Sequence, residues 1–538
     1  MGLFLDAIGL GIPQKKRVYN ADHPRPGVPK LRERRDDGYK RDDRKEHGQG
    51  VWVHREVVQG RHDTDDESYE NEQPRQRVVR REPRVPPKAP PARLPLSVVP
   101  NKFVTPKLLS HLEDIANYRP GGFCPLHIGQ KVGPDDRFTI LNKLGAGSYG
   151  CVWLVEDHKP TETEPGSFKA LKVQNGGSNP DSWDWEEKIS KHMTRRGIKT
   201  EDALKHFVCH AYMDFVIKSP NGNHRASLLP IMGPPVHMVF GPKHGTSTKV
   251  LKDVCRRIGH GLEWLHSKDI AHGDFRSDNI LVQLGPAFER LDKKYIMALY
   301  GGNPKVVPTD KAILARYGPG STGQVPAYRV LPARMDVKKL DLILMKKFPG
   351  TKSFLSHHPK PAIVDFGAAT HIPTMGNRQA LVPIDYRCPE QCVPVGAYPG
   401  GINSKAGDVW AYGCTIVELF RGEQPFGVSD VPDMLASIEE FAGPIPRNYR
   451  RYLQQPPRRD RREPSWVSKY FYRHERLYDK LVGGASCWLH DQLLRKSGLS
   501  RSDARDLVAM LKNLVFTWDP GERSPASVLR KHRFLQTT

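Results

Sequence analysis

The chain has 538 residues, with 83 Lys or Arg against 60 Asp or Glu, so its formal net charge is +23. Glycine and proline, 47 of each, follow no short period, which excludes a collagen-like protein, and a hydrophobic content of 38% excludes a wholly disordered chain. No apolar run reaches the ~18–20 residues that span a membrane, and the eight cysteines form no Cys-x-x-Cys pair. We therefore expect a protein of the cytoplasm or the nucleus, without a structural zinc site, a disulfide framework or a membrane partner. The sequence indicates no oligomeric state.

Composition changes near residue 100. Residues 1–100 contain 21 Lys or Arg and 16 Asp or Glu, mixed along the segment, and prolines cluster over 84–100. Too few apolar residues are present to offset the entropy lost on ordering. We therefore predict a disordered leader, taken as 1–117, and a folded domain over 118–535. A nucleic-acid-binding or nuclear-targeting arm is the alternative, but acidic residues interrupt each basic run.

Alternating apolar residues over 138–155 predict two strands around a glycine-rich turn with the pattern G-x-G-x-x-G-x-V. Glycines let the backbone pass close over phosphate groups, with N–H groups directed at them. Dinucleotide-binding turns share the first six positions, but a helix follows those turns, whereas here a strand follows. The pattern favours a hairpin that covers a nucleotide. The candidate binding residues are Leu144, Gly145, Ala146, Gly147, Ser148, Tyr149, Gly150, Cys151, Val152 and, in the next strand, Ala170.

A short apolar strand over 168–173 places Lys172 where it can neutralise the first phosphates of that nucleotide. Apolar residues at helical spacing over 183–193 predict a helix behind it. We expect Glu186 of this helix to form an ion pair with Lys172, because the apolar positions follow it at the right offsets. Glu187 is the alternative partner.

Two later segments carry side chains with oxygen atoms that could bind a metal, next to apolar residues. An amphipathic helix over 250–265 precedes the segment 270–281, in which Asp274 and Asn279 lie five residues apart. One loop can thus offer a carboxylate that orients a hydroxyl group and an amide that binds a metal. Further on, an apolar strand ends in Asp365, followed by Phe and Gly. Oxygen ligands of this kind suit Mg²⁺, so we expect Asn279 and Asp365 to be the metal ligands.

These motifs stand in the order found in eukaryotic protein kinases, which the chain resembles over 118–535. The segment 386–390, Tyr-Arg-Cys-Pro-Glu, and the helix beginning at Asp408 resemble later kinase elements. The segment 518–526 resembles the closing element, and its Arg523 would pair with Glu390. The resemblance implies a bilobal α+β fold. It comprises a small β-rich N-lobe over 118–232, a large helical C-lobe over 233–535, and an insertion over 282–361 between the loop that carries Asp274 and the strand that ends at Asp365.

The segments 118–129, 220–224 and 231–233, together with the insertion, resemble the SR-protein-specific kinases. Three positions depart from the kinase pattern. Gly273 replaces an Arg that would bind a phosphate of the activation segment, so we expect this segment to order without phosphorylation. Arg276 replaces a catalytic-loop Lys, and Pro230 removes one N–H donor from the segment between the lobes.

The resemblance implies an ATP- and Mg²⁺-dependent kinase that transfers the γ-phosphoryl group to serine or threonine of a protein. Lys172, held by Glu186, would pair with the α- and β-phosphates. Asp274 would accept the hydroxyl proton of the substrate, and Arg276 would steady the phosphoryl group. The alternative is a pseudokinase scaffold that binds partners without turnover.

Substrate choice stays open, because residues 441–480 contain eleven Lys or Arg and four Asp or Glu. Such a segment would repel the Arg-Ser repeats that SR-protein-specific kinases bind, and it would attract acidic peptides or RNA. RNA binding is disfavoured, because the basic run lacks interleaved stacking aromatics, and a solvated loop is the simpler reading.

Overall fold

The computed structural model describes residues 95–100, 103–162, 164, 166–177, 184–310, 324–375, 382–392, 404–427, 431–446, 449 and 485–536. The predicted disorder of 1–94 and most of the basic segment 441–480 lie outside the described residues. Within them, helices and strands are mixed, as predicted. A membrane-spanning helix is absent from this part of the chain, since none there is both long and apolar enough.

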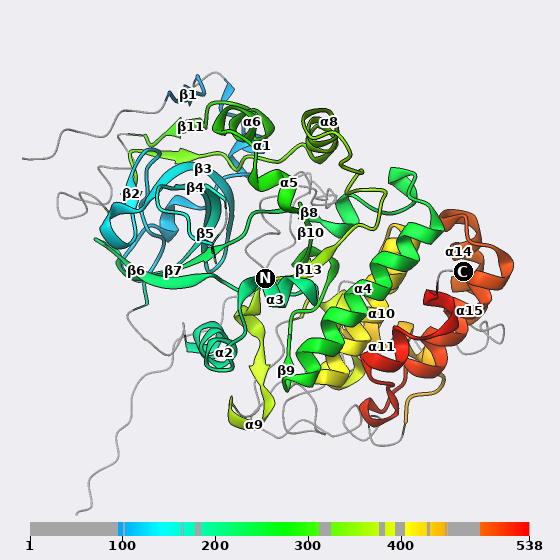
Figure 1. Ribbon diagram of the computed structural model, residues 1–538. Helices are drawn as coiled ribbons and strands as arrows, with labels where there is room; N and C mark the ends of the chain where they lie inside the picture. The colour runs from blue at the N-terminus through cyan, green and yellow to red at the C-terminus, as the bar shows by residue number, and fades with distance from the viewer. Residues whose placement is uncertain are drawn as a thin grey trace, which may run out of the picture. The chain divides into compact units, whose positions relative to one another are not determined.

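The first half of the described chain is dominated by a six-stranded sheet with the order β2-β3-β4-β5-β7-β6 (Figure 1). Every neighbouring pair is antiparallel. The predicted strands are present. The sheet comprises β2 (Lys131–Val132), β3 (Phe138–Gly147), β4 (Gly150–Asp157), β5 (Phe168–Gln174), β6 (Met213–Ser219) and β7 (Gly222–Leu229).

Both faces of this sheet are apolar and buried. In β4, Trp153 and Val155 pack into one cluster with Phe138 and Leu171. The alternate residues Val152 and Leu154 pack into a second cluster on the other face. A sheet that is apolar on both faces needs a cover on each side to keep water away.

The second half of the described chain is mainly helical. Helix α4 (Thr248–Ser267) is the predicted amphipathic helix, and it buries Leu251, Val254, Ile258, Leu262 and Leu265. Helix α10 (Lys405–Arg421) is buried on all sides from Gly407 to Phe420, as expected for a helix at the centre of a core. Around these two lie α11 (Val431–Ala442), α14 (Ala485–Ser497), α15 (Arg501–Leu514) and α16 (Ala526–Leu529).

Short strands connect the sheet to these helices. They form one sheet of order β13-β10-β8 and one of order β14-β9. Helices α2 and α3 precede β6, and α9 follows β14. The bounds are β8 (Met232–Pro235), β9 (Ile270–Ala271), β10 (Ile280–Gln283), β13 (Pro361–Ile363), β14 (Thr370–His371), α2 (Asp184–Arg195), α3 (Thr200–Lys205) and α9 (Ile372–Met375).

The end of the predicted leader is ordered, so the boundary at residue 117 is wrong for the described residues 95–100 and 103–117. Strand β1 (Ser97–Val98) pairs in parallel with β11 (Lys305–Pro308), and α1 (Pro106–Leu109) follows it. Glu113 is buried and forms an ion pair with Lys143 of β3, with Oε2 2.6 Å from Nζ. The composition of the whole segment hides this, because a few residues with partners far along the chain suffice to order it.

The insertion 282–361 is a packed addition where it is described, over 282–310 and 324–361. It contains α5 (Pro286–Glu289), α6 (Lys293–Leu299), β11, β12 (Tyr328–Val330) and α8 (Val337–Lys347). Its side chains Phe288, Leu299, Leu340 and Leu344 share a buried cluster with Val152 and Leu154 of β4. The insertion thereby supplies one of the two covers that the sheet requires.

Candidate active site

The glycine-rich turn is a tight hairpin between β3 and β4, in which Gly145 lies opposite Val152 and Gly147 opposite Gly150. Gly150 has φ +151°, and a Cβ atom there would lie 2.1 Å from the carbonyl oxygen of Val173. Only glycine tolerates both constraints. The side chain of Tyr149 at the tip is 57% exposed. The candidate residues Leu144 to Val152 thus form one continuous hairpin with an exposed tip.

Lys172 lies in β5, directly opposite Val152 of the hairpin. Its Nζ donates to both carboxylate oxygens of Glu186, at 2.9 Å each, and to Oδ1 of Asp365 at 2.8 Å. The predicted ion pair with Glu186 is therefore present. The alternative partner, Glu187, instead pairs with Lys191 of the same helix at 2.8 Å.

Burial and the neighbouring charges have opposite effects on the pKa values of Lys172 and Asp365. Burial by itself would lower the pKa of Lys172, but the carboxylates of Asp365 and Glu186 outweigh it and raise this pKa. Burial likewise acts to raise the pKa of Asp365, and the Lys172 ammonium overcomes it and holds that pKa at about 2. Lys172 and Asp365 are thus both charged at neutral pH.

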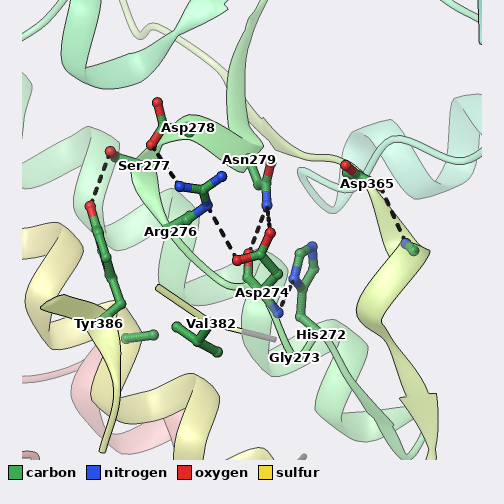
Figure 2. A network of polar contacts seen from close by, with 12 residues as sticks. His272, Gly273, Asp274, Arg276, Ser277, Asp278, Asn279, Asp365, Val382 and Tyr386 are labelled. Carbon is green, nitrogen blue, oxygen red and sulfur yellow. Dashed lines mark hydrogen bonds and ion pairs between the residues drawn. The ribbon is translucent and has the colours of Figure 1, made fainter. Parts of the chain in front are cut away.

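Asp274, Arg276 and Asn279 lie close together in the loop between β9 and β10 (Figure 2). Asn279 Nδ2 donates to the backbone oxygen of Asp274 at 2.8 Å and to its Oδ2 at 2.9 Å. Arg276 Nε is 3.2 Å from Asp274 Oδ1. Burial raises the pKa of Asp274, and the charge of Arg276 counteracts part of this rise. The loop therefore holds one carboxylate between an amide and a guanidinium group.

Helix α10 holds the loop that carries Asp274 in place. Asp408 accepts hydrogen bonds from the backbone N–H of His272 at 2.7 Å and of Gly273 at 3.0 Å. His272 Nε2 lies 2.9 Å from the carbonyl oxygen of Val364, and its Nδ1 accepts from the N–H of Asp274 at 3.3 Å. Since a carbonyl only accepts, His272 is the neutral tautomer with its proton on Nε2. It ties the Asp274 loop to the strand that leads into Asp365.

Buried oxygen atoms at this site suit a divalent cation. Asn279 Oδ1 is buried and accepts no hydrogen bond from the described residues, whereas Asp274 Oδ1 faces Nε of the Arg276 guanidinium at 3.2 Å. Asp365 presents an ionised carboxylate. Hard cations such as Mg²⁺ take oxygen ligands and complete their shell with waters and phosphates rather than with an all-protein cage. The described residues hold no cluster of three or more His, Cys, Asp or Glu that could bind a metal.

A second predicted ion pair is also present. Arg523 Nη1 and Nη2 donate to the two carboxylate oxygens of Glu390 at 2.6 and 2.7 Å, and both side chains are buried. Tyr386 donates to Glu418 and contacts Ser277 Oγ at 3.3 Å. The segment around Tyr386 is thus joined to the Asp274 loop through Ser277. We did not single out Ser277 or Glu418 in the sequence, because a buried hydroxyl or carboxylate leaves no periodic signal.

A cavity of about 300 Å³ lies beside this site, and of the predicted site residues it is lined by Leu144, Ala170, Lys172, Glu186 and Asp365 but not by 145–152, Asp274, Arg276 or Asn279. Lys172, Glu186 and Asp365 line it together with apolar side chains from the candidate set and from neighbouring strands: Leu144, Ala170, Leu229 and Leu281. The insertion also lines it, through Tyr300 and residues 333–337. This contribution was not predicted, because the alternating apolar residues over 138–155 indicate strands but not which segment covers them.

No protein-family model matches the chain. The meiosis induction protein kinase IME2/SME1 of Saccharomyces cerevisiae is 24% identical over 439 residues, which is 75% of this chain and 55% of that protein. The dual specificity protein kinase CLK1 of Mus musculus is 22% identical over 407 residues, 74% of this chain and 66% of that protein. The serine/threonine-protein kinase AFC1 of Arabidopsis thaliana is 23% identical over 412 residues, 74% of this chain and 71% of that protein.

The chain spans 55% and 66% of the lengths of the first two relatives. The names of these relatives support a protein kinase in general. The narrower resemblance to SR-protein-specific kinases stays a proposal. Over 74–75% of its length, this chain is similar to protein kinases of the serine/threonine and dual-specificity classes, which supports a protein kinase.

Proposed function

We propose that this chain is an active, ATP- and Mg²⁺-dependent serine/threonine protein kinase, close to the SR-protein-specific kinases. The observation that carries the proposal is the meeting of Lys172, Glu186 and Asp365 at 2.8–2.9 Å on one cavity. The Asp274–Asn279 pair in the neighbouring loop adds to it. In this proposal the bilobal domain covers 118–535, extended at its start by the ordered residues from 95 onward.

The residues present fit the roles that such a reaction needs. Lys172 is charged and held by Glu186, so it can pair with the α- and β-phosphates when its hydrogen bond to Asp365 is exchanged for one to the nucleotide. Asn279 Oδ1 and the Asp365 carboxylate would hold Mg²⁺, which neutralises charge on the phosphates when bound. Asp274, whose Oδ1 accepts no hydrogen bond from the described residues, can orient the substrate hydroxyl and accept its proton. Arg276 lies beside it as a fixed positive charge for the phosphoryl group.

A pseudokinase scaffold is the competing function. Loss of the strand lysine, the loop aspartate or the metal-binding aspartate would favour it, but Lys172, Asp274 and Asp365 are all present and in contact with partners of the expected kind. RNA binding by 441–480 concerns a segment that lies mostly outside the described residues. A peptide array that compares Arg-Ser repeats with serines flanked by acidic residues would show which class of substrate the kinase prefers. We also propose that the protein acts in the cytoplasm or the nucleus.

Asp274→Asn tests the proposal in the full-length chain. We expect turnover with [γ-³²P]ATP and a Ser/Thr peptide library to fall by about 10²–10⁴-fold, the usual contribution of a positioned proton acceptor. The affinity for Mg-ATP should stay within about twofold, because the Asp274 side chain is not needed to bind nucleotide.

Asp202→Asn is the matched control, because this exposed aspartate lies on α3 and pairs with Lys205 of the same helix. It should leave turnover unchanged. Wild-type protein that binds ATP but transfers no phosphoryl group would favour the scaffold, and full turnover in Asp274→Asn would contradict the assigned role.

A further inference from the structure

One wall of the cavity that contains Lys172 and Asp365 is built by the insertion 282–361. Tyr300 and residues 333–337 line this cavity together with Leu144, Ala170 and Leu281. Met335 is the apolar side chain at the middle of the 333–337 segment. Arg334 and Asp336 on either side of it are exposed to solvent. The segment therefore has one apolar residue between two charged residues at the rim of the cavity.

Backbone hydrogen bonds hold this segment at both ends. The N–H of Ala333 donates to the carbonyl oxygen of Lys143 at 2.8 Å, and Lys143 directly precedes Leu144 at the start of the glycine-rich turn. The N–H of Asp336 donates to the carbonyl oxygen of Leu299 in α6 at 3.3 Å. Asp336 also begins α8, because its Oδ1 accepts from the N–H of Lys339 at 3.0 Å. Met335 thus lies on a short bridge between β3 and α6, beside the hairpin.

The segment 333–337 lies against a buried apolar cluster. Leu299 and Leu340 on either side of it are at most 2% exposed, and they belong to the cluster that also contains Leu141 and Leu154 of the sheet. Figure 1 shows α6 near the sheet and α8 on the other side of α6. Burying leucine side chains in this way stabilises a packed arrangement. The wall is therefore a built part of the cavity rather than a loop that happens to lie near it.

We infer that the insertion supplies part of the binding surface for the nucleotide base, with Met335 as the apolar side chain that packs against it. This inference rests on the proposed function, namely that the cavity binds a purine nucleoside triphosphate. An aromatic base needs apolar surface around its ring. The sheet provides this surface through Leu144 and Ala170, β10 through Leu281, and the insertion through Met335. Met335 is thus a positioning residue for the nucleotide and takes no part in the phosphoryl transfer.

Met335→Ala in the full-length protein tests this inference by calorimetric titration with Mg-ATP and by steady-state kinetics. We expect the Kd and the KM for ATP to rise about five- to tenfold, with kcat unchanged, because the lost contact is made equally in the ground state and the transition state. Met335→Leu, which keeps the apolar volume, should restore the affinity to within about twofold of the wild type.

Met345→Ala is the matched control, because Met345 lies on α8 of the same insertion, is 36% exposed and does not line the cavity. It should leave the Kd unchanged. Equal ATP affinity of the Met335→Ala variant and the wild type would overturn the inference while leaving the proposed function intact. A wild-type protein that binds no ATP would instead overturn the proposed function, and melting temperatures of all variants exclude a loss of fold as the cause.

Discussion

At the scale of single residues, buried charges in this protein are matched by partners far along the chain. Lys172 is 4% exposed and lies between the carboxylates of Glu186 and Asp365, 14 and 193 residues away. Arg523 and Glu390 are 133 residues apart and form a bidentate pair. Removing one member of such a pair leaves the other charge buried without compensation, which costs far more than the pair contributes as a whole.

Arg523→Met measures this effect. We expect it to lower the free energy of unfolding by about 3–5 kcal/mol, because Glu390 stays buried without its partner. The measurement is the shift of the urea midpoint at neutral pH. The double variant Arg523→Met/Glu390→Gln should recover part of the loss, since no buried charge then remains unpaired.

Arg533→Met is the matched control. Arg533 pairs with Asp506 on the surface, and its side chain is 74% exposed, so its loss should change stability by no more than about 1 kcal/mol. Equal shifts of the urea midpoint for Arg523→Met and Arg533→Met would show that the buried Arg523–Glu390 pair matters no more for stability than the exposed one.

At the scale of elements, α2 and β14 meet through two histidines. The rings of His192 in α2 and His371 in β14 lie 3.9 Å apart between centroids. Burial lowers the pKa of both rings. Arg196 nearby lowers both further, whereas Asp269 acts in the opposite direction. Both α2, which carries Glu186, and β14, which follows Asp365, thus depend on a contact between neutral imidazoles.

This contact predicts a pH dependence of stability. Because each ring has a lower pKa in the folded protein than the ~6.5 of a free histidine, the unfolded chain takes up protons first as the pH falls. The stability contribution is therefore complete above about pH 6.5 and is lost as the pH falls below it. We expect the melting temperature to drop between about pH 7.5 and 5.5 by a few degrees more in the wild type than in His192→Gln/His371→Gln.

His111→Gln, outside this contact, is the control and should keep the pH dependence of the wild type. If the double variant also kept the full pH dependence, the loss of stability in acid would have another origin.

At the scale of the whole molecule, the end of the predicted leader and the insertion complete the core. The ordered residues from 95 onward reach the sheet through the Glu113–Lys143 ion pair, whose side chains are 2% and 0% exposed, while β1 pairs with β11 of the insertion. Tyr118 also donates to Glu113 Oε1 at 2.6 Å. The insertion packs on both faces of the same sheet, with Val306 and Val330 in one cluster and Leu299 and Leu340 in the other. The sheet that carries Lys172 thus depends on the end of the leader and on the insertion.

Two truncated chains test the contribution of the leader end. A chain that begins at residue 118 should be less stable than one that begins at residue 95 by about 3–5 kcal/mol, because Lys143 then loses its buried partner. Thermal unfolding followed by circular dichroism gives the comparison. Glu113→Gln in the chain that begins at residue 95 should reproduce most of the loss, and identical melting of the two truncated chains would contradict the role of this pair.

Much of the candidate site could be predicted from the sequence, because local chemistry is recorded there directly. The glycines of the hairpin, the five-residue spacing of Asp274 and Asn279, and the periodicity of α4 each report on segments shorter than about 20 residues. Glycine at position 150 is required by one close backbone contact, and its place in the motif was evident without the structure.

The tertiary structure alone decided which segments meet. It pairs Glu186 rather than Glu187 with Lys172, orders the chain from residue 95 instead of 118, and places Met335 of the insertion on the cavity. Periodicity reveals that a face is buried but not what buries it, because that choice depends on the free energy of packing among segments tens to hundreds of residues apart. The sequence by itself therefore determined the reactive groups of this protein, and the packing determined the walls that surround them.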